Sequence, residues 1–354
     1  MDKYKIDSHK LVYHLPRVCN WLEGKNIYPI YMEISPVGSC NHRCVFCAYD
    51  FIGYPNRKLD CDRLLTFIDE AKEAGVKSIL YAGEGEPLLH PDIEKFIVHS
   101  SNRGIDVGLF TNGQLLREEL AEAIIPSLTF VRFSFNGGTK DNYAEVHKVK
   151  PDIFERVVAN IKKAVDIKKE NSLDVVIGVQ YVLLPENKDY LLDAVKTLKN
   201  VGVDYFVIKP FVQQNHLQSY KIGDQFSLSS IVNILDEAEN FSNEDFTVVA
   251  RKESFEGYGK RTYKHCYGTS FISVLNSVGD IATCLPYWDK EDFTFDNIYD
   301  NTFEDIWFGE RRKKIIKYLE NELDTKKCPP NCRPNAINEF LWDLKSPPEH
   351  VNFI

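Results

Sequence analysis

Residues 37–50 have the sequence VGSCNHRCVFCAYD, in which three cysteines fall within eight positions. Cys40, Cys44 and Cys47 come directly after residues 27–35, IYPIYMEIS, whose apolar–polar alternation predicts a β-strand. A loop with three thiols so close together can fold around a compact multi-iron cluster, with every thiolate pointing inward. The spacing therefore favours an iron–sulfur site at the end of the first strand.

A single zinc ion is the alternative occupant of this loop. Structural zinc takes four closed ligands, and His42 or Cys61 could complete such a set. The spacing favours iron–sulfur but leaves the zinc site open.

Strand-like and helix-like segments alternate outward from this loop. The predicted strands are 27–35, 76–83, 105–113, 128–137, 173–184 and 204–211. The predicted helices between them are 62–75, 91–104, 115–125, 152–170 and 187–200. Such alternation implies parallel strands joined by right-handed crossovers. We expect an α/β fold, a partial (β/α)6 barrel, because six units are too few for the closed eight-fold barrel. A Rossmann-like sheet is the rival, and no G-x-G-x-x-G follows a strand.

The bulk composition restricts the class of protein. With 354 residues, 44% of them hydrophobic and 27% charged, the chain has the composition of a soluble globular protein. A formal charge of -9 argues against sequence-independent binding of nucleic acid. No apolar run long enough for a membrane span and no apolar signal core occur, so we expect a cytoplasmic protein without a membrane partner. The nine cysteines are odd in number and cannot all pair within one chain.

The motif C-x-x-x-C-x-aromatic-C, with Phe46 as the aromatic residue, resembles the signature of the radical S-adenosylmethionine (radical SAM) superfamily. The resemblance implies a 4Fe–4S cluster held by Cys40, Cys44 and Cys47. In that family the fourth iron has no protein ligand, and the amino and carboxylate groups of S-adenosylmethionine occupy its free position. The missing fourth ligand would then be the substrate.

The same resemblance assigns further contacts to S-adenosylmethionine. In AGEGEPLLHP, Gly85 and Glu86 look like the family's GGE element, which holds the amino group, although Glu84 stands where a glycine is common. A carboxylate suits this role because it accepts hydrogen bonds from an ammonium group.

Ribose-contacting positions follow the next strands. The resemblance places Ser134 and Asn136 of RFSFNGG there, and Asn112 of FTNG ends the strand before. Each could instead be an ordinary turn residue. Lys209 also falls at the carboxyl end of a predicted strand, and these ends form one face of a parallel barrel, where active sites lie.

A second group of cysteines follows near the C-terminus. It consists of Cys266, Cys284, Cys328 and Cys332. The group resembles the Twitch domain, a shortened form of the SPASM extension of radical SAM enzymes. Full SPASM domains carry seven cysteines and two auxiliary clusters, so four cysteines imply one auxiliary 4Fe–4S cluster with all irons ligated by protein. A zinc-ribbon-like structural site is the alternative.

The surrounding pattern predicts a small C-terminal α+β domain. Residues 270–284 predict a hairpin that turns near 276–279, and residues 302–323 predict one helix. We expect four regions along the chain. They are an N-terminal extension (1–27), the radical SAM partial barrel (28–225), a linker with a helix (226–260) and the Twitch/SPASM-like domain with its tail (261–354). The first region leaves too little length for the leader-binding domain of peptide-modifying relatives.

The resemblance implies a radical mechanism. The reduced cluster, fed by an external flavodoxin- or ferredoxin-type donor, would split S-adenosylmethionine into methionine and a 5′-deoxyadenosyl radical that abstracts a hydrogen atom from a small-molecule substrate. An auxiliary cluster suits electron transfer, which favours a radical SAM oxidoreductase that dehydrogenates, oxidises or epimerises a sugar or aminocyclitol. The alternatives are a peptide-modifying maturase and a non-catalytic metal-binding or regulatory protein.

Candidates for proton or hydrogen transfer rest on position alone. Lys209, Gln180, His216 and Tyr287 are candidate bases. An epimerase would need a hydrogen donor, and Cys19 and Cys61 are the two thiols outside both groups. Each could instead be a small hydrophobic side chain in the core.

Overall fold

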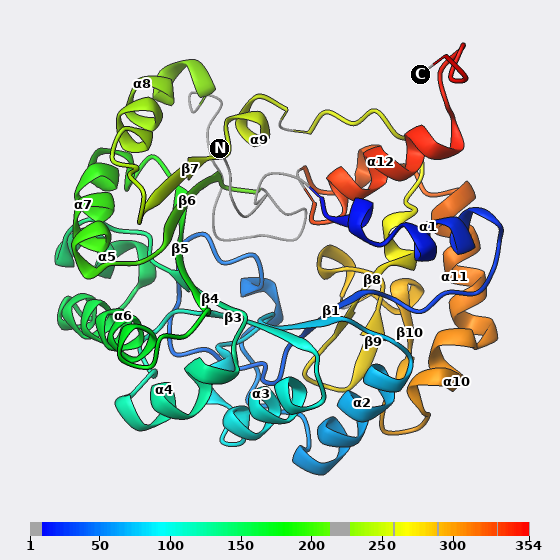
Figure 1. Cartoon of the computed structure of the whole chain (residues 1–354), viewed down its shortest axis with the longest axis horizontal. Helices are drawn as coiled ribbons and strands as arrows, with labels where there is room; N and C mark the ends of the chain where they lie inside the picture. The colour runs from blue at the N-terminus through cyan, green and yellow to red at the C-terminus, as the bar shows by residue number, and fades with distance from the viewer. Residues whose placement is uncertain (1–8, 213–226, 258, 289, 331, 354) are drawn as a thin grey trace.

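The computed structural model describes residues 9–212, 227–257, 259–288, 290–330 and 332–353. Its centre is a ten-stranded sheet with the order β10-β9-β8-β1-β2-β3-β4-β5-β6-β7 (Figure 1). Neighbouring strands from β1 to β7 pair in parallel, as in a partial barrel. None of the described helices is long and apolar enough to cross a membrane.

Strands and helices alternate in the barrel, and the helices cover its outer face (Figure 1). The strands are β1 (Tyr31–Ile34), β2 (Ser78–Tyr81), β3 (Asp106–Thr111), β4 (Phe130–Ser134), β5 (Val176–Leu183), β6 (Tyr205–Pro210) and β7 (Thr247–Ala250). The helices are α2 (Cys61–Glu73), α3 (Ile93–Asn102), α4 (Glu118–Ile124), α5 (Lys140–His147), α6 (Asp152–Glu170), α7 (Leu191–Val201) and α8 (Leu228–Glu239). All six strands predicted from the sequence are therefore present.

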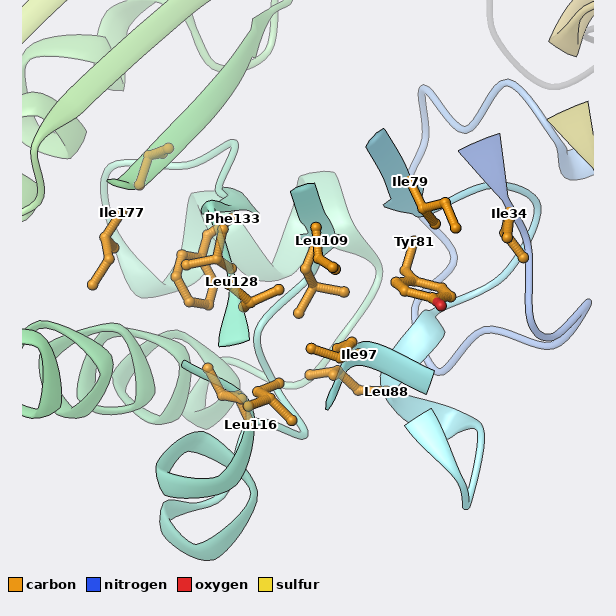
Figure 2. Packing of buried hydrophobic residues seen from close by; sticks show 14 of the residues in the cluster. Ile34, Ile79, Tyr81, Leu88, Ile97, Leu109, Leu116, Leu128, Phe133 and Ile177 are labelled. Atoms are coloured by element: carbon orange, nitrogen blue, oxygen red, sulfur yellow. The ribbon is translucent and has the colours of Figure 1, made fainter. Parts of the chain in front are cut away.

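The main core lies between the sheet and these helices. Figure 2 shows side chains of the strands, such as Tyr81, Leu109 and Phe133, packed against Leu88 and Ile97 from the helical side. Period-2 alternation places every second strand residue on this outer face, while the residues between them face the barrel interior.

The barrel has one more parallel strand than the six predicted. Strand β7 pairs in parallel with β6 and follows α8, inside the 226–260 region that was expected to be a linker with a helix. It follows a part of the sequence in which the alternation of strand-like and helix-like segments is no longer clear. A short α9 (Lys252–Glu256) follows it.

The C-terminal region extends the sheet of the barrel. Its strands and helices are β8 (Ile272–Leu275), β9 (Asp280–Ala282), β10 (Thr294–Asn297), α10 (Phe303–Phe308), α11 (Glu310–Asn321) and α12 (Asn335–Lys345). The predicted hairpin is confirmed, with Gly279 at φ +95° in its turn. The single helix expected over 302–323 is wrong, because the extended backbone of Gly309 divides it into α10 and α11.

The N-terminal helix α1 (Leu15–Leu22) packs on this C-terminal region (Figure 1). The Trp21 ring lies 5.4 Å from that of Tyr267 and 5.6 Å from that of Phe271, centroid to centroid. The two ends of the described chain thus share a second, smaller core.

A buried carboxylate fastens the C-terminal hairpin to the barrel. The side chain of Glu84, which is 0% exposed, accepts hydrogen bonds from Arg57 Nη2 at 2.6 Å and from the backbone N–H of Ser277 at 2.8 Å. Arg57 also donates through Nε to Ser277 Oγ at 2.7 Å. Glu84 therefore joins the loop after β2 to the turn between β8 and β9.

We predict that Glu84→Ala lowers the free energy of unfolding by about 2–3 kcal/mol, because Arg57 and the Ser277 N–H lose a buried partner. This loss of unfolding free energy is smaller than for a fully buried ion pair, because the Arg57 side chain is 33% exposed. Anaerobic denaturant unfolding of the reconstituted protein measures it. Glu310→Ala, which breaks an exposed pair with Lys313 on α11, is the control and should change nothing measurable. Equal losses in both variants would contradict the role of Glu84.

Candidate active site

The loop after β1 brings its three cysteines to the mouth of the barrel. Cys40, Cys44 and Cys47 all line a cavity of about 880 Å³. The backbone N–H of Cys47 donates to Cys44 O at 3.1 Å, and that of His42 donates to Cys40 Sγ at 3.4 Å. The loop therefore curls around its own sulfur atoms.

A buried imidazole supports this loop from α5. His147 Nδ1 lies 3.2 Å from Cys44 Sγ and 3.4 Å from His42 Nδ1, while His147 Nε2 accepts the backbone N–H of Asn136 at 3.1 Å. Because Nε2 is an acceptor, the proton of the neutral ring belongs on Nδ1 and faces the Cys44 sulfur. Burial lowers the pKa of both histidines, that of His42 to about 4, so both rings are neutral near pH 7.

An amide network fixes the other side of the loop. His42 Nε2 lies 2.7 Å from Gln114 Oε1, which also accepts from Asn41 Nδ2 at 3.0 Å. Asn112 Nδ2 donates to Asn41 Oδ1 at 2.8 Å, and Asn112 Oδ1 accepts from Gln114 N at 3.0 Å. The end of β3 is thereby tied to the cysteine loop.

Gly85 sits where no side chain fits. A Cβ atom there would lie 2.3 Å from Ser39 O and 2.5 Å from Val37 O, which is a clash with backbone. The glycine thus permits the loop after β2 to touch the cysteine loop.

Glu86 is buried next to this contact. Its carboxylate accepts hydrogen bonds from Thr111 Oγ1 at 2.6 Å, Asn112 N at 2.7 Å and Leu88 N at 3.1 Å. Burial raises the pKa of Glu86 to about 7, although these three donors favour the charged form. A bound cation would complete its environment.

The structure brings most of the predicted contacts to the cavity, but not all. Its lining includes Phe46, Gly85, Glu86, Asn112, Ser134, Gln180 and Lys209. Asn136 lies behind the wall, where its Oδ1 accepts the Val182 N–H at 2.6 Å and its Nδ2 lies 3.3 Å from His147 Nε2. His216 lies outside the described residues.

The remaining catalytic candidates do not line the cavity. Cys19 is exposed on α1, and Cys61 is the first residue of α2, half-buried against the core. Tyr287 donates its hydroxyl to Cys328 Sγ at 3.8 Å and to Lys327 O at 3.3 Å. Its position suits support of the second cysteine group.

The second cysteine group converges at the far side of the same cavity. Cys284 and Cys332 line it, while Cys266 accepts a hydrogen bond from Asn338 Nδ2 at 3.4 Å. Burial raises the pKa of the Cys284 thiol, and the nearby thiols of Cys266, Cys332 and Cys328 raise it further. Such thiols become thiolates only when a positively charged centre binds them.

The sulfur spacing tests the zinc alternatives. A tetrahedral zinc would hold its sulfur ligands about 3.8 Å apart, given Zn–S bonds of about 2.3 Å. Within the described residues, one group of three or more metal-binding atoms lies within 4.8 Å of one another, and it is His42, Cys44 and His147. Cys40 and Cys47 do not join it, and no three thiols of the second group come so close. Among the described residues, neither cysteine group therefore presents three thiols at the spacing of a single zinc ion.

Several charged residues that line the cavity were missed in the sequence, among them Glu33, Arg132, Arg251 and Arg333. A signal existed for two of them, because Glu33 and Arg132 interrupt otherwise apolar strands, β1 and β4, in which a charge facing the helices would be costly.

Family comparisons match both parts of the chain. The sequence model of the radical SAM superfamily matches residues 34–203, and that of the SPASM iron–sulfur cluster-binding domain matches residues 266–334.

Among curated proteins, a cofactor-modifying protein for the tungsten-containing aldehyde ferredoxin oxidoreductase of Pyrococcus furiosus is 24% identical over 299 residues, covering 80% of this chain and 81% of that protein. A GTP 3′,8-cyclase of Helicobacter pylori is 27% identical over 198 residues, or 54% of this chain and 59% of the cyclase. A dTDP-4-amino-4,6-dideoxy-D-glucose ammonia-lyase of Streptomyces venezuelae is 26% identical over 186 residues, or 51% of this chain and 38% of the lyase. The chain thus spans little more than half of the cyclase and less of the lyase.

Solved structures share the fold. Streptococcus suis SuiB bound to S-adenosylmethionine superposes with a TM-score of 0.66 at 17% identity, covering 87% of this chain and 72% of SuiB. Native anSMEcpe with bound AdoMet superposes with a TM-score of 0.58 at 18% identity, covering 82% of this chain and 84% of that chain. The cysteine loop lies at the end of β1, and Cys266 and Cys284 flank the hairpin of β8 and β9. Because the two sequence models match these parts of the chain, the chain belongs to the radical SAM superfamily and carries a C-terminal SPASM-type iron–sulfur domain.

Proposed function

We propose that this protein is a cytoplasmic radical SAM oxidoreductase that abstracts a hydrogen atom from a small polar molecule held in the barrel cavity. The observation that carries the proposal is that thiols of both cysteine groups open onto one cavity of about 880 Å³. A volume of this order suits small-molecule pockets.

The two groups have separate tasks in this proposal. Cys40, Cys44 and Cys47 hold the 4Fe–4S cluster that binds S-adenosylmethionine. The second group holds one auxiliary 4Fe–4S cluster, with ligands Cys266, Cys284, Cys328 and Cys332. With S-adenosylmethionine bound, the first cluster would supply the electron that generates a 5′-deoxyadenosyl radical, and the auxiliary cluster would accept an electron.

Residues of the chain itself would bind and orient S-adenosylmethionine and exclude water from the cysteine loop. Glu86 is placed to accept the ammonium of S-adenosylmethionine, since it lines the cavity and three donors hold its carboxylate in position. Ser134 is the open hydroxyl for a ribose contact. Asn112 remains a candidate contact, whereas Asn136 is placed to orient His147. Phe46 packs beside His147, with ring centroids 6.1 Å apart, and shields the loop.

The substrate class and the outcome are the finer part of the proposal. We favour dehydrogenation, or a related oxidation or epimerisation, of a sugar or aminocyclitol, with electrons entering from a flavodoxin- or ferredoxin-type donor. The names of two relatives support a sugar-bearing small molecule, because one acts on GTP and another on a dTDP-linked amino sugar.

We predict that replacing Cys40, Cys44 and Cys47 together with alanine abolishes 5′-deoxyadenosine formation. In contrast, Cys328→Ala with Cys332→Ala should keep that activity while removing about four iron atoms per chain, because the second group does not hold the cluster that binds S-adenosylmethionine. Anaerobic iron analysis and chromatography after dithionite reduction measure both. A wild-type chain that binds zinc at both groups and makes no 5′-deoxyadenosine would refute the proposal.

We also predict that Cys61→Ala and Cys19→Ala each leave turnover unchanged, because neither thiol lines the cavity. Product formation per 5′-deoxyadenosine is the measurement. A loss of product in either variant, with iron content intact, would show that the thiol reaches the substrate after all.

A further inference from the structure

Several cationic side chains line the inner wall of the cavity. Among them are Lys209 on β6, Arg132 on β4, Arg251 after β7 and Arg333 after Cys332. After burial, the charges of these three arginines lower the pKa of Lys209, whereas the carboxylate of Glu33 raises it.

Glu33 is already committed to one of these cations. Its Oε2 lies 2.7 Å from Arg333 Nη2 and accepts the Tyr31 hydroxyl at 3.1 Å. Arg333 Nη1 in turn donates to Tyr31 Oη at 2.6 Å. These contacts neutralise the charge of Arg333. Among the described residues, neither Lys209 nor Arg132 contacts a carboxylate oxygen of Glu33.

The side chain of Arg132 is held in place through Nε, and its terminal guanidinium nitrogens can bind a ligand. Its Nε donates to Tyr205 Oη at 2.7 Å, and its guanidinium lies 4.8 Å from the centroid of the Phe110 ring. No carboxylate among the described residues pairs with it. The aromatic packing aims the guanidinium into the barrel, where two parallel N–H groups can meet an oxyanion.

Lys209 likewise has no hydrogen-bond or ion-pair partner within the described part of the chain. Burial and the neighbouring arginines lower its pKa to about 7. An ammonium buried among guanidinium groups is costly unless an anion joins it.

We propose that Lys209 and Arg132 form a binding site for an oxyanion of the substrate, a carboxylate or a phosphoryl group. The inference rests on the proposed function, because the site lies in the same cavity as both cysteine groups. It narrows the substrate class to acidic molecules, such as a sugar acid or a sugar phosphate. The oxyanion would fix one end of the substrate while its C–H bonds face the cysteine loop.

The test compares three sugars that share a ring and differ in charge. Glucose 6-phosphate, glucuronate and glucose are titrated calorimetrically into anaerobic holoenzyme saturated with S-adenosylmethionine, whose own carboxylate is then already bound. We expect at least one of the two acids to bind and neutral glucose to bind at least about tenfold more weakly, the size of a charge-assisted hydrogen bond. Whichever acid binds more tightly assigns the oxyanion.

Variants locate the site. Lys209→Met should weaken the binding of the acid about tenfold or more, and Lys209→Arg should retain it. Lys162→Met on the outer helix α6 is the matched control, because it makes the same change at an exposed position. Arg132→Met tests the second residue of the site.

Three results would overturn the inference. One is binding of glucose as tight as that of both acids, or no binding of either acid at millimolar concentration. Another is unchanged affinity in both Lys209→Met and Arg132→Met. The third is a loss of affinity for S-adenosylmethionine in Lys209→Met, which would assign the cations to the carboxylate of that molecule. The proposed function survives all three as long as reduction still yields 5′-deoxyadenosine.

The pH dependence provides a further prediction. Arg132, Arg251, Arg333 and Glu33 influence the pKa of Lys209. Glu253, on the helix α9 that packs against β6, lines the same cavity. Lys209 is charged below its pKa, so affinity for glucuronate, which keeps its charge, should fall as pH rises from about 6 to about 8.5. A bound anion raises the pKa of Lys209, so the midpoint should lie above 7.

The variants give this pH profile its controls. Lys209→Arg should bind equally well across the range, because a guanidinium stays charged. Lys209→Met should bind weakly throughout. A wild-type affinity that rises with pH would indicate that neutral Lys209 acts as a base, and would contradict the oxyanion site.

Discussion

The pairing of β1 with two parallel neighbours determines where everything else in the site can lie. Strand β1 is in register with β2 on one side, Met32 beside Ile79, and with β8 on the other, Met32 beside Ser273. The first cysteine loop leaves the carboxyl end of β1, whereas Cys266 precedes β8 and Cys284 follows β9, which returns antiparallel to β8. Side chains of β1 and β8, among them Glu33 and Ser273, line the cavity onto which both groups open.

The buried charged residues of the site differ in how they are paired. Glu84 is fully paired and serves attachment of the hairpin, which explains why a charged residue can replace a glycine of the family's motif. Glu86 is held by three hydrogen-bond donors that carry no charge, and it lines the cavity. Lys209 and Arg132 have no such carboxylate among the described residues. Since burial penalises each unpaired charge, the last pair is the part of the cavity that most needs a ligand.

Local patterns predicted the fold well where elements are long and periodic. The 19 residues of α6 carry a clear apolar stripe, and the eight of β5 are buried on both faces, so both were found. Strand β7 was missed because it follows a part of the sequence in which strand-like and helix-like segments no longer alternate clearly. The break at Gly309 was missed because one glycine does not always end a helix. The joining of the hairpin to β1 depends on long-range packing, which no local pattern records.

The residues of the site were likewise predictable where local sequence determines their position. Motif spacing led to the first cysteine loop, Gly85 and Glu86, which the structure brings to one cavity, because these residues lie in short loops whose geometry is set by neighbours in sequence. His147 was missed because it reaches Cys44 from a helix 103 positions away. Asn136 illustrates the opposite error, since a residue at the right strand end is turned behind the wall by its bond to Val182. Strand position predicts the face, whereas the direction of a side chain depends on its partners.

The charges of the cavity also divide it into two ends. S-adenosylmethionine carries a sulfonium and an ammonium, which the inner wall of Lys209, Arg132 and Arg251 would repel. Glu86 and the thiolates of the cysteine loop attract the same groups at the other end. An acidic substrate is attracted by the inner wall and repelled by Glu86. Charge alone therefore directs cofactor and substrate to different ends of the cavity. In a confined, weakly screened space this sorting also orients the substrate, because its oxyanion points to the inner wall and its carbon skeleton remains toward the cysteine loop.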